Sequence, residues 1–114
     1  MGNYMYLFRR NETVLQSMSP EQMQQTMEKW TNWIETLKKE GHIKQLGERL
    51  DGTGKVLRGK SKAVTDGPYI EVKDSVGGFM LVEARDMDQA VDLSKGCPIL
   101  EIDGTVEIRP VISM

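Results

Sequence analysis

Few residues in this chain could do chemistry, and the first of them is the aspartate of the segment Asp66-Gly67-Pro68. A carboxylate that projects into a pocket can act as a general acid or base, so Asp66 is a candidate catalytic residue. The same three residues also suit a turn, because Asp binds its own backbone, Gly tolerates positive φ and Pro stiffens the chain. Both interpretations predict that the segment joins two extended pieces, at residues 63–65 and 69–72.

Charged residues alternate with apolar ones near the end of the chain. Glu107 and Arg109 alternate with Val106 and Ile108, as on a strand with one polar and one apolar face. If the apolar pair packs against helices, the charged pair lies on the inward face of a barrel, where a charge requires a partner. An anionic ligand held by the guanidinium fork and a structural ion pair at a subunit interface both satisfy this pattern.

We expect the charged candidates to meet in one cleft. The turn delivers Asp66 to the end of an extended segment, and Glu71 lies on the next one. A carboxylate beside a guanidinium keeps its charge in a partly dry site. The expected ligand-binding residues are Asp66, Glu71 and Arg109, with Trp30 or Phe79 in the wall. Such a cleft would bind a small polar or anionic ligand, or it would hold two subunits together.

The remaining reactive side chains predict neither a metal site nor a reactive thiol. A single histidine, His42, supplies no metal site and no catalytic triad, and we expect it to be a surface or packing residue. Cys97 follows a predicted helix, whose dipole raises the thiol pKa, so a structural role is expected. The segment Gly52-Thr53-Gly54-Lys55 lacks the glycine and hydroxyl spacing of a phosphate-binding loop. No metal and no cofactor are expected.

Length and composition predict one globular domain over residues 1–114. The formal net charge is −2, so no broad cationic field is available for nucleic acid or an anionic membrane. One cysteine forms no internal disulfide and suits a reducing compartment. No apolar run approaches the ~18 residues of a membrane span, and the N-terminus lacks the layout of a signal peptide. The expected location is the cytoplasm.

The elements that position these residues follow the order β-α-β, extra hairpin strands, β-α-β. A helix is expected from Pro20 to Gly41, with Ser19 as its cap and Gln22 completing a capping box, and a second helix with a capping box from Asp86. Expected strands lie at residues 4–8, 42–50, 55–58, 63–65, 69–72, 77–84, 99–102 and 105–111, with a hairpin turn at 103–104. This order predicts an α+β fold of the ferredoxin-like, split βαβ type with an antiparallel sheet and an extra hairpin.

The strands are apolar on both faces. Residues 4, 6 and 8 point to one side and residues 5 and 7 to the other, and Met80 and Val82 likewise oppose Phe79 and Leu81. Near-continuous apolar strands predict burial on both sides of the sheet, whereas two helices cover only one. We therefore expect a homodimer through the sheet faces.

Five segments resemble the DGPF branch of the YCII-related family: residues 64–71, 77–79, 86–90, 97–98 and 106–110. The resemblance spans roughly residues 4–112 and implies a bacterial protein that forms a dimeric α+β barrel, in which two ferredoxin-like subunits pack sheet to sheet. Better-studied relatives carry a histidine in the first helix and a late Asp-Pro segment. Here residues 20–40 contain no histidine, and Cys97 precedes Pro98, so no His/Asp mechanism carries over. Tyr69 stands where the motif has phenylalanine.

Two functions from different classes fit these observations. The first is a small-molecule enzyme or binding protein with a site inside each half of the dimeric barrel, and the inward-facing charges favour it. The second is a non-catalytic regulatory or interaction module, which the resemblance links to extracytoplasmic sigma-factor systems. The missing histidine favours the second function.

Overall fold

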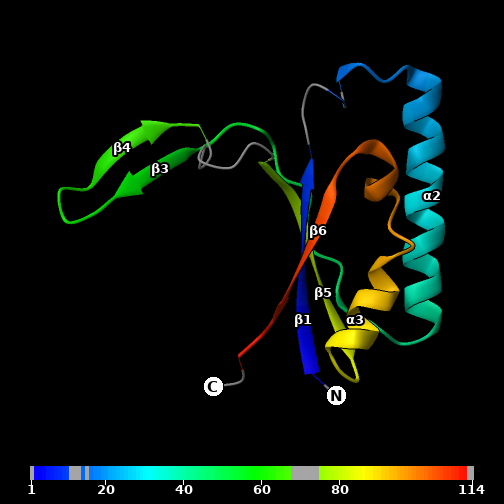
Figure 1. The fold of residues 1–114 in the computed structure, drawn as a ribbon. Coiled ribbons are helices and arrows are strands. Elements are labelled where there is room, and N and C mark those ends of the chain that lie inside the picture. Colours follow the sequence, from blue (N-terminus) through cyan, green and yellow to red (C-terminus); the bar gives the residue numbers. More distant parts are fainter. Residues whose placement is uncertain (1, 11–13, 15, 68–74, 113–114) are drawn as a thin grey trace.

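A four-stranded antiparallel sheet forms the centre of the protein, whose structure is a computed structural model that describes residues 2–10, 14, 16–67 and 75–112 (Figure 1). Its strands are β1 (Gly2–Arg10), β2 (Ile43–Gln45), β5 (Ser75–Ala84) and β6 (Thr105–Pro110), in the order β2-β5-β1-β6. The two central strands are the first and third of these four in chain order, as the split βαβ plan requires. The predicted α+β, ferredoxin-like fold is therefore confirmed.

Two helices cover one face of this sheet, on the right of Figure 1. Helix α2 (Pro20–Lys39) begins at the expected capping box, where Ser19 Oγ accepts from the Gln22 amide at 3.1 Å and the Gln22 side chain accepts from the Ser19 amide at 2.9 Å. Helix α3 (Met87–Ser94) is capped by Asp86, which accepts from the Gln89 amide. No second capping box forms at this cap, because the Gln89 side chain accepts instead from the amide of Arg85.

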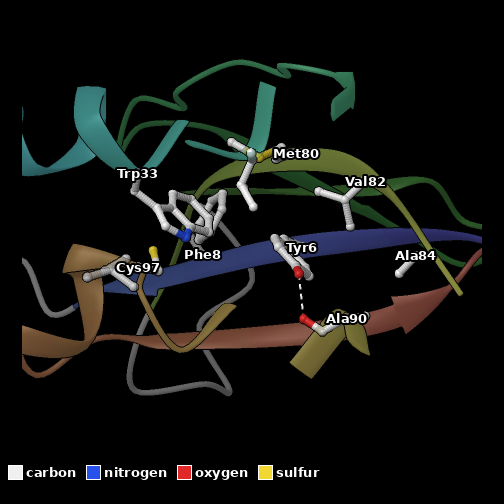
Figure 2. Packing of buried hydrophobic residues seen from close by; sticks show 10 residues of the cluster. Tyr6, Phe8, Trp33, Met80, Val82, Ala84, Ala90 and Cys97 are labelled. Atoms are coloured by element: carbon white, nitrogen blue, oxygen red, sulfur yellow. Dashed lines mark hydrogen bonds between the residues drawn. The ribbon is translucent and has the colours of Figure 1, made fainter. Parts of the chain in front are cut away.

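The hydrophobic core lies between the helices and the sheet (Figure 2). Strands β1 and β5 contribute every second residue to it, and α2 contributes Trp33 and Leu37. Two buried polar groups are satisfied by backbone carbonyls: Tyr6 OH donates to Ala90 O, and Trp33 Nε1 donates to Leu93 O at 3.0 Å. The core members are Tyr6, Phe8, Trp33, Leu37, Met80, Val82, Ala84, Ala90, Cys97 and Ile99.

Over the described residues, the other face of the sheet carries no helix (Figure 1). At its centre lie Met5, Leu7, Phe79 and Leu81, which we call the open-face patch; in register, Leu7 is opposite Phe79 and Met5 is opposite Leu81. All four side chains are only half-buried among one another. The predicted alternation of two apolar faces is thus confirmed, because the residues between these four belong to the core.

Strands β3 (Lys55–Arg58) and β4 (Ala63–Asp66) form a separate two-stranded sheet. This hairpin projects from one end of the main sheet, on the side away from the helices (Figure 1). The radius of gyration is 15.6 Å, compared with about 13 Å for a compact domain of this length. The projecting hairpin accounts for the difference.

Two expected strands differ in the structure, and a third, expected at residues 69–72, lies outside the described residues. Residues 98–102 form the 3₁₀-helix η1 (Pro98–Ile102) rather than a strand, because Pro98 opens a helical turn and Ile99 is buried in the core. Asp103, at φ 62°, ends this turn instead of making a hairpin. The strand expected over residues 42–50 stops at Gln45, with a register shift between Ile43 and Gln45, and the chain meets β5 again where Arg49 pairs with Gly78.

Candidate functional site: the charged cluster on the open sheet face

Three charged side chains form a cluster at the β6 side of the open face. Arg9 donates through Nε and Nη2 to Glu107 Oε1, at 3.1 and 3.0 Å, and Arg109 Nη1 lies 3.4 Å from Glu107 Oε2. Strand β1 supplies the first of these residues and β6 the other two. We call Arg9, Glu107 and Arg109 the guanidinium cluster; its two cations and one carboxylate carry a net charge of about +1 at neutral pH.

The Arg9 contact dominates the electrostatics of this cluster. Hydrogen bonding from the Arg9 guanidinium is the largest cause that holds the pKa of Glu107 below its usual range, and Arg109 adds to it. The side chains of Arg9 and Glu107 are 24% and 37% exposed, whereas that of Arg109 is 68% exposed. Arg109 is therefore the more accessible cation of the two.

The cluster borders the open-face patch directly. Glu107 is in register with Leu7, and Arg109 is in register with Met5. On the opposite side of the patch, Lys44 of β2 forms an ion pair with Glu83 of β5 at 3.6 Å. Charged pairs thus flank an apolar centre on the open face.

The residues predicted for the site lie in different parts of the structure. Phe79 and Arg109 both lie on the open face. Trp30 lies on the helix side, where its ring meets Phe8 edge-on with centroids 5.1 Å apart. Asp66 lies in the hairpin, with a side chain that is 90% exposed and 2.5 Å from Lys55 Nζ. Glu71 falls outside the described residues.

Asp66 and Arg109 therefore occupy different sheets and form ion pairs with different partners. Arg9 was not among the predicted site residues, although the alternation of β1 could have identified it. It follows Met5 and Leu7 at intervals of two, on the face opposite Tyr6 and Phe8. Its role depends on pairing with a residue 98 positions away, which the sequence pattern does not specify.

His42 and Cys97 both have structural contacts. His42 Nδ1 lies 2.8 Å from Glu83 O, and its side chain is 12% exposed. Cys97 is 2% exposed, and burial raises the pKa of its thiol to about 12. The sequence predicts a raised thiol pKa because of the helix dipole. In the structure, the main cause of the raised pKa is burial, which removes the thiol from water.

An open cleft of about 400 Å³ lies on the helix side, between α2 and the segment that joins α3 to η1. Trp33 and Cys97 line its floor and two lysines line its rim. Both lysines already pair with carboxylates, Lys29 with Glu101 at 3.0 Å and Lys95 with Asp92 at 3.1 Å. This cleft therefore offers less charge to a ligand than the guanidinium cluster does.

The described part of the chain contains no group of three or more His, Cys, Asp or Glu side chains that could hold a metal ion. None of its helices combines the length and apolar character needed to cross a membrane.

None of the curated proteins matches the chain. A model of the YCII-related domain matches residues 3–114, which is nearly the whole sequence. The matched region contains α2, α3, every strand of the main sheet except the first residue of β1, and the complete guanidinium cluster. The chain therefore belongs to the YCII-related domain family.

Proposed function

We propose that the protein works as a homodimer whose open sheet faces meet, and that the guanidinium cluster of each subunit binds a small anionic or polar ligand. The observation that supports this proposal is the excess of guanidinium over carboxylate beside an apolar patch. Two arginines share Glu107, and Arg109 makes the longer contact at 3.4 Å. Its planar fork suits carboxylate and phosphate groups.

The dimer is supported by the open-face patch. Helices cover one side of the sheet, while the other side has four apolar side chains in two adjacent strands. Contiguous apolar surfaces of this kind mark interfaces, and a two-fold axis would let one patch cover its own copy. The motifs that resemble the DGPF branch imply the same sheet-to-sheet arrangement, and the proposal includes membership of that branch.

Covering the patch would also strengthen the ligand site. A guanidinium in a water-poor environment interacts with an anion more strongly than one in bulk water. Arg109 is opposite Met5, at the border between the charged cluster and the apolar patch. The proposed ligand therefore lies at the margin of the dimer interface, with its charge toward Arg109. Asp66 and Glu71 are not needed for this contact.

Replacement of Arg109 tests the ligand site. We expect Arg109→Met to weaken the binding of inorganic phosphate or succinate by about tenfold or more, because a hydrogen bond to a charged group contributes about 1.5–3 kcal/mol. Binding is measured by isothermal titration calorimetry, with the melting temperature and sedimentation coefficient as checks on fold and assembly. The matched control is Lys29→Met, which removes an exposed cation on the helix side.

Three results are informative. Loss of anion binding in Arg109→Met, with an unchanged dimer and melting temperature, supports the ligand site. Equal binding by wild type, Arg109→Met and Lys29→Met contradicts it. A lower melting temperature or dissociation with unchanged binding shows that the cluster is a structural ion pair, which favours the regulatory or interaction module over the binding protein.

Replacement of Glu107 gives a second test, in which anion binding is expected to become tighter rather than weaker. Its carboxylate competes with any anion for both guanidinium groups, so Glu107→Gln should bind phosphate more tightly than wild type. Because the folded-state pKa of Glu107 is lowered, its contribution to stability is present above its ordinary unfolded pKa and is lost as the pH falls through the folded value. Wild type should therefore lose stability on acidification more steeply than Glu107→Gln, in urea unfolding between pH 7 and pH 3. Weaker phosphate binding by the variant would contradict the proposed competition.

A further inference from the structure

The hairpin formed by β3 and β4, residues 55–66, is here called the arm. It has its own two-stranded sheet, and its four residue pairs run from Lys55 opposite Asp66 to Arg58 opposite Ala63. Two-stranded hairpins alone are marginally stable in water, because neither face is covered. The arm therefore gains little stability from its own strands and would gain more by packing against another surface.

One face of the arm is apolar at its centre. Leu57 and Val64 are directly opposite each other, and they are 62% and 58% exposed. Val56 and Thr65 form the next pair and point to the other face. A cross-strand pair of large aliphatic side chains on a projecting ribbon is a compact surface that a partner could bury.

The arm and the rest of the chain have opposite charges. The arm contains four of the fifteen Lys and Arg residues and one of the seventeen Asp and Glu residues, which gives it a net charge of +3. The remainder of the chain therefore carries −5, since the total is −2. The net charge of the rest of a second copy is thus opposite in sign to that of the arm, which favours association of the two.

The direction of the arm fits the same partner. In Figure 1 the helices lie to the right of the sheet and the arm extends to the left, on the side of the uncovered sheet face. The molecule measures 46 × 44 × 19 Å, so it is broad in two directions and thin in the third. The arm and the open sheet face therefore form two sides of a corner, and a body that covers the sheet face also lies beside the arm.

We infer that the arm clasps a second copy of this chain, with Leu57 and Val64 packed against the partner subunit and the basic residues of the arm attracted by its net negative charge. This inference rests on the homodimer of the proposed function. A two-fold axis requires that both arms make the same contact, so each subunit is held at the sheet face and at its flank.

Paired substitutions on the two faces of the arm test this inference. We expect Leu57→Ser with Val64→Ser to weaken dimerisation by more than about tenfold, because two buried aliphatic side chains are lost from each of two equivalent contacts. The control is Val56→Ser with Ala63→Ser, which alters the opposite face of the same two strands. The dimer dissociation constant is measured by sedimentation equilibrium, with far-UV circular dichroism as the check on folding.

A sheet-face variant, Leu81→Asp, distinguishes failure of the arm contact from failure of the proposed dimer. If wild type is a monomer, both the dimer and the arm contact are wrong. If Leu81→Asp dissociates the dimer while both arm variants retain the wild-type constant, the arm inference alone is wrong. If the Leu57/Val64 variant dissociates and Leu81→Asp does not, the arm contact stands and the sheet-face assembly is wrong.

Amide hydrogen exchange gives a measurement that does not depend on a variant. When the arm packs against the partner subunit, the amides of β3 and β4 are protected. They should exchange at least about tenfold more slowly at protein concentrations above the dimer dissociation constant than at concentrations below it. Equal exchange at both concentrations, with a dimer present at the higher one, would overturn the arm contact.

Discussion

At the scale of single residues, burial keeps two ionisable groups of the core neutral. Burial raises the pKa of the Tyr6 hydroxyl, which donates to the carbonyl of Ala90, and raises the pKa of the Cys97 thiol to about 12. Their neutral forms therefore stabilise the fold below their unfolded pKa values, and this stability is lost as the pH rises through the folded values. Both groups serve packing, while the charge of the site lies on the opposite face of the sheet.

The thiol of Cys97 should consequently be inert in the folded protein. The shift from 9.0 to about 12 leaves about a thousandfold less thiolate at pH 7.5 than in the unfolded chain, and the thiolate is the reacting species. We expect iodoacetamide to label Cys97 at least that much more slowly in native protein than in guanidinium chloride, as followed by mass spectrometry. Comparable labelling rates in the two conditions would show that the thiol is exposed or activated.

At the scale of elements, the edge of the main sheet depends on a close approach at Gly47. This residue has φ 72°, and a Cβ atom there would lie 1.8 Å from the carbonyl oxygen of Phe79. The chain leaves β2 before this point and then returns to β5, where the Phe79 amide donates to Glu48 O at 3.2 Å. Gly47 lies beside Phe79, so this approach also helps position the open-face patch.

Substitution of Gly47 should therefore destabilise the protein more than substitution of a glycine in open space. Gly41 is the control, because it has φ 78° and a Cβ atom there would have no neighbouring atom within 4 Å. Gly41→Ala should lower the free energy of unfolding by about 1–2 kcal/mol, because alanine is strained in the left-handed conformation. Gly47→Ala should lower the free energy of unfolding in urea clearly more, because the backbone of β5 or of the segment around Gly47 must move. Equal losses of stability would mean that this segment relaxes freely.

At the scale of the whole molecule, the main asymmetry is that one sheet face is packed and the other is open. The helices, the aromatic cluster and Cys97 lie on one side, while the guanidinium cluster and the open-face patch lie on the other. The projecting arm lies on this second side as well (Figure 1). The proposed dimer contact and the proposed ligand site therefore both lie on the same half of the molecule.

A charge at the centre of the open-face patch should separate the subunits without unfolding them. Leu81→Asp places a carboxylate in the proposed interface, and burial of an unpaired charge is costly enough to prevent contact. We expect a folded monomer by sedimentation velocity and circular dichroism, where wild type is a dimer at micromolar concentration. Leu100→Asp is the control, because this side chain is 46% exposed in η1, on the helix side. A dimer in Leu81→Asp would place the interface elsewhere.

Several features follow from the sequence alone because they depend on neighbouring residues. Ser19, Pro20 and Gln22 determine the start of α2, since a capping box forms within one turn of chain. Period-two alternation assigns Met5 and Leu7 to one face of β1 and Tyr6 and Phe8 to the other. The same alternation correctly separates Glu107 and Arg109 from the packed pair Val106 and Ile108. Together these local signals predict the α+β class and the order of the main elements.

Other features were decided by tertiary contacts. Residues 99–102 have the composition of a strand, yet they form most of the 3₁₀-helix η1, in which Ile99 is buried in the core. The sequence predicts Trp30 or Phe79 in the wall of a site; helix packing puts Trp30 on the other side of the sheet from Arg109, whereas Phe79 shares the open face with it. The pairing of Arg9 with Glu107 and the direction of the arm likewise depend on how distant segments meet in space. Local periodicity specifies the face on which a side chain lies, but only the packed chain determines its partner across that face.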